Sequence, residues 1–245
     1  MAYAAMQRRF FDPRSGDYRD TTGGPVGSHA WPFSQALAAT LAVAPLERPR
    51  AHMGRGGGVP WTTTPGEPSR NTVSTANAAV LGLRLYLLDP QAAFLQSSTR
   101  MLSWLDECLL APNGLFWDSI GTDGTVDRSE WSYNQGSVME AYRLLYVATG
   151  NPSDLARAEL VADSTLAAFS SRWSAEPAEF AVIFFRRLLD LAALDGRADY
   201  VAAAQAYADR LWRQRPHSLL QQAAVVQLYA ALATDRLARR HRQPG

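Results

Sequence analysis

Side chains of the kinds that bind sugars recur in this sequence at the starts of expected helices and in long loops. Sugar rings stack on aromatic faces, while carboxylates and amides satisfy the hydroxyl groups. The expected substrate-binding residues are Trp31, Trp61, Asn71, Trp117, Asp118, Trp131, Tyr133, Asn134 and Gln135. The alternative for each tryptophan is a structural role, in which the ring covers the core and the indole N–H binds the backbone. The gathering of the set at one kind of position favours a carbohydrate cleft.

Cleavage of a glycosidic bond needs carboxyl groups, and two lie beside the aromatic set. Retaining glycosidases hold two carboxyl groups about 5–5.5 Å apart. Asp118 and Glu130 are the only reasonable catalytic candidates in the long loop. Both have an alternative as solvated loop residues, and Thr122-Asp123-Gly124 has the composition of a turn. A general acid among them needs a pKa raised by burial against Trp117 or Trp131.

Other site chemistries find no support. The four histidines are scattered, without the spacing of metal ligands, so we expect neither a metal nor a cofactor. The run Gly54–Gly58 lacks the Lys-Ser/Thr ending of a phosphate-binding loop. The one cysteine, Cys108, lies in an apolar helical stretch, which indicates a buried and inert thiol.

Composition indicates one globular domain over residues 1–245, with 47% hydrophobic and 19% charged residues. The formal net charge of +1 argues against a nucleic-acid partner. No run of about 18 apolar residues occurs, so we expect no membrane span. No signal peptide is visible, and the expected location is the cytoplasm.

Apolar residues recur at spacings of three and four along most of the chain, which predicts about nine helices. They are expected at 2–10, 32–44, 73–88, 91–110 and 137–149, then through Leu155–Phe169, and at 178–194, 197–214 and 217–238. Gly150 is an expected C-cap, and Asn151 or Ser153 an expected N-cap. Short links make neighbouring helices antiparallel hairpins. Hairpins build a solenoid or a closed toroid, and the lack of a repeat period favours an all-α toroid.

Two segments are not helical, 45–72 and 112–132, and long loops in a compact domain are usually functional. Around them lie Gly56-Gly57-Gly58-Val59-Pro60-Trp61, Asn71–Ala79, Gly114-Leu115-Phe116-Trp117-Asp118 and Trp131-Ser132-Tyr133-Asn134-Gln135-Gly136. These elements resemble glycoside hydrolase family 76, and the Tyr-Asn-Gln-Gly element is the most specific. The resemblance runs from about residue 1 to residue 240. It implies an (α/α)6 toroid fold. It also implies an enzyme that cleaves α-1,6-linked mannan with retention of configuration at the sugar.

One feature of that family has no counterpart here. The resemblance implies two adjacent aspartates, one a nucleophile and the other a general acid/base, between the Trp31 helix and the Gly-Gly-Val-Pro-Trp loop. The sequence contains no Asp-Asp dipeptide. About nine of twelve toroid helices are present, so we infer an internal deletion near residues 45–56. The loss argues against catalysis by this chain.

Three hypotheses follow. The first is an enzyme of the α-1,6-mannanase type that acts on mannan-type polysaccharide. The second is a catalytically inactive remnant that binds carbohydrate and self-associates through apolar helix faces such as those of Leu37, Leu41, Leu83 and Tyr86. The third is a helical scaffold for protein partners, which the lack of a repeat period disfavours. Another kind of (α/α)6 enzyme is disfavoured by the Tyr-Asn-Gln-Gly element.

Overall fold

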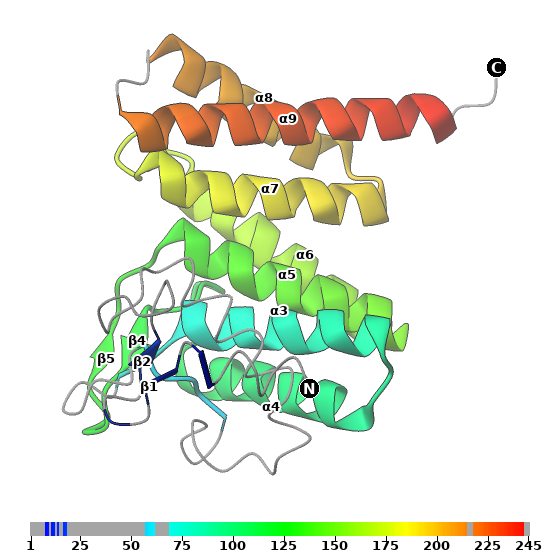
Figure 1. Ribbon diagram of the computed structural model, residues 1–245. Helices are drawn as coiled ribbons and strands as arrows, with labels where there is room; N and C mark the ends of the chain where they lie inside the picture. The colour runs from blue at the N-terminus through cyan, green and yellow to red at the C-terminus, as the bar shows by residue number, and fades with distance from the viewer. Residues whose placement is uncertain are drawn as a thin grey trace.

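Helices dominate the fold, as the computed structural model in Figure 1 shows. The structure describes residues 8–9, 11–12, 14, 17–18, 57–61, 69–214 and 218–242. Its helices are α3 (Thr72–Leu88), α4 (Ala92–Cys108), α5 (Ser132–Thr149), α6 (Pro152–Phe169), α7 (Ala178–Asp195), α8 (Ala198–Arg213) and α9 (Leu219–Arg242). The all-α prediction is confirmed. The helix predicted at 32–44, and all but residues 8–9 of that at 2–10, lie outside the described residues.

The helices form two layers. Helices α3, α5, α7 and α9 lie side by side and pack on one another in that order (Figure 1). Helices α4, α6 and α8 cover them on one side. Helices α3, α5, α7 and α9 contact one another more closely than α4, α6 and α8 do. The two layers therefore curve, with α3, α5, α7 and α9 as the inner layer.

Short links produce this alternation of inner and outer helices. Helices α5 and α7 end at Gly150 and Gly196, whose φ angles of 71° and 79° are left-handed and suit glycine. The Asn151 side chain then accepts a hydrogen bond from the Ser153 N–H (3.1 Å) and caps α6. The predicted caps at Gly150 and Asn151 are confirmed.

A buried carboxylate joins three inner helices. Glu140 on α5 is fully buried. Its Oε1 lies 3.0 Å from Arg84 Nη2 on α3 and 3.4 Å from Arg187 Nη1 on α7. Its Oε2 accepts a hydrogen bond from Arg143 Nε (2.7 Å), one turn along α5. Burying a carboxylate is costly unless cations surround it, so this cluster specifies how the three helices are placed.

The segment predicted as a loop over 112–132 contains regular structure. Strands β4 (Ser119–Ile120) and β5 (Val126–Asp127) form a hairpin, and β3 (Arg70–Asn71) pairs antiparallel with β4. The predicted turn at Thr122-Asp123-Gly124 connects β4 to β5, and Asp123 Oδ1 accepts from the Thr125 N–H (2.9 Å). A second pair, β1 (Phe11–Asp12) with β2 (Asp17–Tyr18), lies nearer the N-terminus.

Helix α5 begins at Ser132, five residues before the predicted start. Tyr133, Asn134 and Gln135 therefore lie in its first turn. In the described part of the chain, no helix is long and apolar enough to cross a bilayer.

Candidate functional site

The three-stranded sheet lies at the N-terminal ends of α3 and α5 (Figure 1). The backbone of Asp118 is held from two sides, because its carbonyl accepts from the Thr72 N–H (2.9 Å) and its N–H donates to the Asp127 carbonyl (3.0 Å). The Thr72 hydroxyl also donates to the Trp117 carbonyl (2.5 Å). Helix α3 and strand β5 thus position Trp117 and Asp118, both half-buried.

The Asp118 carboxylate meets the first turn of α5. Its Oδ1 accepts from Asn134 Nδ2 (2.9 Å) and from the Tyr133 hydroxyl (3.3 Å). Burial raises the pKa of Tyr133, and the negative charge of Asp118 raises it further, so the phenol stays protonated and can donate. Asn134 is fully buried, and its Oδ1 has no partner among the described residues. The structure therefore brings together three of the predicted site residues.

An aromatic cluster adjoins this carboxylate. The rings of Trp131 and Tyr133 stack with centroids 6.4 Å apart. Phe180, in the first turn of α7, contacts both rings edge-on, at 5.7 Å from Trp131 and 4.7 Å from Tyr133. Phe180 is not among the sequence-predicted residues, since its spacing in an apolar helix is that of a core residue. Only the packing of α7 against α5 shows its place beside Trp131.

Trp117 offers a limited aromatic surface. Its ring packs against the hydrophobic core. The guanidinium of Arg128, an exposed residue just after β5, lies 5.2 Å from the Trp117 ring centroid. A cation over an indole face is attracted by the ring quadrupole. Arg128 therefore covers part of the surface on which a sugar ring would stack.

Gln135 does not have the expected sugar-binding role in this structure. It is fully buried. Its Oε1 accepts from the Phe116 N–H (2.8 Å), and its Nε2 donates to the carbonyls of Phe116 (2.9 Å) and Trp131 (3.1 Å). Every polar atom of the amide is engaged with loop backbone, which leaves none for a ligand. Gln135 holds the loop before Trp117 against α5.

Gly136, the last residue of the same motif, lies where α5 meets α7. A Cβ atom added there would be 2.7 Å from the Cα atom of Phe184 on α7. Only glycine allows so close a backbone approach. The Tyr-Asn-Gln-Gly element thus combines two residues that reach Asp118 with two that serve packing.

Glu130 lies apart from Asp118 in its interactions. Its Oε1 accepts from Asn113 Nδ2 (2.8 Å), and its Oε2 lies 3.2 Å from Arg172 Nη1. Among the described residues the two carboxylates share no partner. Glu130 is engaged in holding the loop, and no interaction among the described residues joins it to Asp118.

The remaining predicted residues fall at the margin of the site or beyond it. Trp61 is 64% exposed, and its backbone N–H donates to the Ser69 carbonyl (3.0 Å) beside β3. Asn71 is buried, and its Oδ1 accepts from the Ser74 hydroxyl (3.1 Å). Trp31 lies outside the described residues, as does the whole of the expected junction at 45–56.

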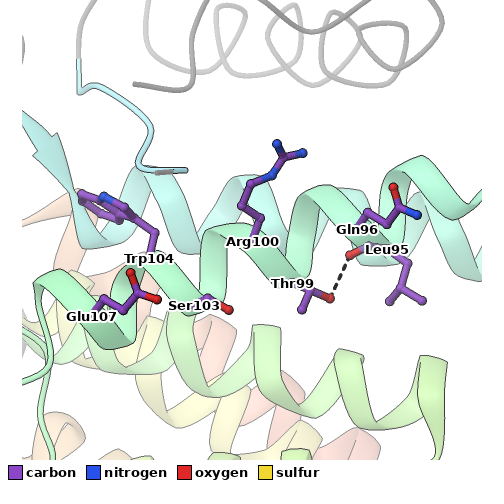
Figure 2. A pocket seen from close by; sticks show the side chains of 7 residues that line it. All are labelled: Leu95, Gln96, Thr99, Arg100, Ser103, Trp104 and Glu107. Carbon is purple, nitrogen blue, oxygen red and sulfur yellow. Dashed lines mark hydrogen bonds between the residues drawn. The ribbon is translucent and has the colours of Figure 1, made fainter. Parts of the chain in front are cut away.

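A separate hollow lies on the surface of α4 (Figure 2). Its lining residues are Leu95, Gln96, Thr99, Arg100, Ser103, Trp104 and Glu107. All seven come from this one helix, and Trp104 is only 2% exposed. The Thr99 hydroxyl is engaged with the Leu95 carbonyl (2.9 Å). Among the described residues, the hollow is therefore lined from one helix only and is not enclosed by a second element.

Metal-binding residues do not gather within the part of the chain that the structure describes. No group of three His, Cys, Asp or Glu side chains there could hold an ion. Burial raises the pKa of Cys108, which is half-buried, and this disfavours a reactive thiolate.

Comparison with known proteins identifies relatives of this chain. Residues 42–215 match the sequence model of glycosyl hydrolase family 76. A family 76 glycoside hydrolase from a bovine Bacteroides thetaiotaomicron strain is similar with a TM-score of 0.67 and 23% identity, over 83% of this chain and 51% of that chain. The Lin0763 protein from Listeria innocua has a TM-score of 0.70 and 20% identity, over 89% of this chain and 69% of that chain.

A third similar structure is a complex with a sugar. It is an inactive variant of the α-1,6-mannanase GH76A of Salegentibacter sp. HEL1_6, with two aspartates replaced, in complex with α-1,6-mannotetrose. It has a TM-score of 0.63 and 26% identity, over 73% of this chain and 62% of that chain. No curated protein matches this chain. The chain spans 51% and 62% of the Bacteroides and Salegentibacter structures.

Proposed function

Because this chain belongs to glycosyl hydrolase family 76 and is a partial all-α toroid, we propose that it binds α-1,6-linked mannan-type oligosaccharides without cleaving them. The proposed site comprises Asp118, Trp131 and Tyr133, with Trp117 at its margin. The mannotetrose complex of the Salegentibacter relative supports this choice of sugar.

The observation that carries the proposal is the arrangement around Asp118. A half-buried carboxylate is held by the Tyr133 hydroxyl and by Asn134, next to the stacked rings of Trp131 and Tyr133. An anionic acceptor beside an aromatic face is the combination that suits a sugar, whose hydroxyl groups donate and whose C–H face stacks. Asp118 Oδ2 has no hydrogen-bond partner among the described residues and is available as an acceptor.

The same arrangement supports binding rather than hydrolysis. Retaining hydrolysis needs a nucleophile and a general acid about 5–5.5 Å apart. Asp118 is one carboxylate, but Glu130 is engaged with Asn113 and Arg172. The sequence has no Asp-Asp dipeptide, and the mannotetrose-bound relative is described as inactive with two aspartates replaced.

Isothermal titration calorimetry with α-1,6-mannotetraose tests this proposal on the full chain. We expect binding by the unaltered protein, and at least a tenfold loss of affinity in Asp118→Asn, because a hydrogen bond to a charged group contributes about 1.5–3 kcal/mol. Trp131→Ala should lose affinity as well. Trp212→Ala is the matched control, since this tryptophan is 66% exposed but lies on α8.

Release of reducing ends from α-1,6-mannan tests the second half of the proposal, and none is expected. Hydrolysis that disappears in Asp118→Asn or Glu130→Gln would show that the chain is an enzyme. Absence of any heat of binding at millimolar sugar would overturn the binding function itself.

A further inference from the structure

Helix α5 carries the candidate site on its first turn, yet its cap comes from a distant segment. The N-cap residue Trp131 makes no side-chain cap hydrogen bond. Instead Glu176, in the connection between α6 and α7, accepts from the Ser132 N–H (2.9 Å) and from the Ser132 hydroxyl (2.6 Å) through Oε1. A carboxylate at a helix N-terminus satisfies free N–H groups and complements the helix dipole.

Ser132 is the residue through which this contact reaches the site. It is fully buried and lies between Trp131 and Tyr133 in the chain. Holding its backbone N–H and its hydroxyl fixes the direction in which the two flanking rings leave the helix. Tyr133 in turn donates to Asp118, so Glu176 is linked to the site through Ser132 and its neighbour in the chain.

The segment that carries Glu176 is itself anchored. Trp173, three residues earlier, is 9% exposed, and its ring contacts Phe185 at 4.7 Å in the core. The Glu176 N–H donates to the Arg172 carbonyl (3.1 Å). Phe180, one turn later, packs against Trp131 and Tyr133. The start of α5 is therefore held at two points, by hydrogen bonds from Ser132 to Glu176 in the α6–α7 connection and by ring contacts with Phe180 in the first turn of α7.

We propose that Glu176 is a positioning residue for the sugar site, acting through Ser132 to orient Trp131 and Tyr133. This inference rests on the proposed function for its binding readout. Both hydrogen bonds to Ser132 lie on one carboxylate oxygen, Oε1, and these two bonds are the contacts through which Glu176 orients the start of α5.

Three variants of the full chain test the proposal by calorimetry with α-1,6-mannotetraose. Glu176→Ala removes both hydrogen bonds, and we expect affinity to fall by about two- to thirtyfold, the range that follows from loss of a helix cap. Glu176→Gln keeps an acceptor in place and should recover most of that affinity. Ser132→Ala keeps the backbone hydrogen bond and should have an intermediate affinity.

A control separates positioning from general stability. Tyr142→Phe removes the hydrogen bond from Tyr142 to Asp106 (2.5 Å) on another side of α5, and should lower the melting temperature without changing affinity. Wild-type affinity in folded Glu176→Ala would overturn the proposal. So would an equal loss of affinity in Tyr142→Phe at equal destabilisation.

A spectroscopic readout keeps this inference distinct from the proposed function. The near-ultraviolet circular dichroism of the stacked pair is obtained as the difference between the protein and Trp131→Phe. We expect this signal to change in Glu176→Ala and to return in Glu176→Gln. If the unaltered protein binds no sugar, the proposed function fails, and an unchanged difference signal in Glu176→Ala would separately overturn the positioning role.

Discussion

At the scale of single residues, neighbours in the sequence have different roles in the site. Trp117 and Asp118 are adjacent, but Trp117 has its ring on the core and under Arg128, whereas Asp118 accepts from Tyr133 and Asn134. Asp118 is therefore held by hydrogen bonds, while the accessible part of Trp117 depends on one exposed arginine.

Removal of the Arg128 side chain should strengthen sugar binding. An exposed cation–π contact is worth about 0.5–1 kcal/mol, so Arg128→Ala should raise the affinity for α-1,6-mannotetraose by about two- to fivefold when the sugar stacks on Trp117. Calorimetry measures the change. Arg100→Ala on α4 is the control and should leave affinity unchanged. A weaker affinity in Arg128→Ala would mean instead that the guanidinium contacts the ligand.

At the scale of elements, charge as well as apolar packing holds the inner helices together. Glu140 contacts arginines from α3, α5 and α7. Burial opposes ionisation of Glu140, but the hydrogen bonds and charges of Arg143, Arg187 and Arg84 outweigh it and lower its pKa below the ordinary 4.5. Asp190 nearby has the opposite shift, because burial and the charge of Glu140 raise its pKa.

Replacement of Glu140 should make the protein less stable in a pH-dependent way. Glu140→Gln leaves three guanidinium groups without their carboxylate, and should lower the free energy of unfolding by about 3–5 kcal/mol at pH 7. A lowered folded-state pKa stabilises the fold above about pH 4.5, and this contribution disappears as the pH falls further. The difference in the free energy of unfolding between the two proteins, measured in urea, should thus stay constant from pH 7 to about pH 4.5 and become smaller at lower pH.

The control for this experiment is Glu107→Gln on the exposed surface of α4, which should unfold like the unaltered protein. Asp190 is present in every variant, so its own titration contributes to the pH dependence of the free energy of unfolding in all of them. A difference between Glu140→Gln and the unaltered protein that stays constant with pH would contradict the role assigned to the Glu140 charge.

At the scale of the whole molecule, the two layers of helices form a partial toroid. The chain covers 51–69% of the Bacteroides, Salegentibacter and Listeria structures. Of the apolar residues predicted to be exposed, Leu83 on α3 is fully buried and Tyr86 is half-buried. Leu37 and Leu41 lie outside the described residues. The largest exposed apolar residues include Leu219 (84%), Leu220 (62%) and Val226 (67%) at the start of α9.

Self-association through α9 is the expectation at this scale. Exposed apolar side chains clustered on one helix favour contacts between copies. Sedimentation velocity should show a mass that rises with concentration, and Val226→Gln should shift the distribution toward the monomer with little change in melting temperature. Leu160→Gln, at a 49% exposed site on the outer helix α6, is the matched control. A monomer at all concentrations would contradict the prediction.

Periodicity and turn chemistry were enough to predict much of the fold, whereas the family was predicted from the resemblance of sequence motifs. The apolar spacing of three and four predicted six of the seven described helices to within three residues at their N-terminal ends, and Gly150 and Asn151 identified one of the links. Helix α5 began five residues earlier than predicted, because its first turn is capped by Glu176 from 44 residues away. Local sequence carries no signal for a cap that arrives through tertiary contact.

The sequence by itself determined that this chain is an all-α member of glycosyl hydrolase family 76 without an Asp-Asp pair, since these follow from local periodicity, motifs and composition. The tertiary structure alone decided which motif residues face a site. Gln135 and Asn134 are adjacent polar residues, yet Gln135 binds loop backbone and Asn134 reaches Asp118. Phe180 entered the aromatic cluster only through the packing of α7 on α5. The reason is physical: the role of a side chain depends on what packs against it, and those partners lie up to about fifty residues away along this chain.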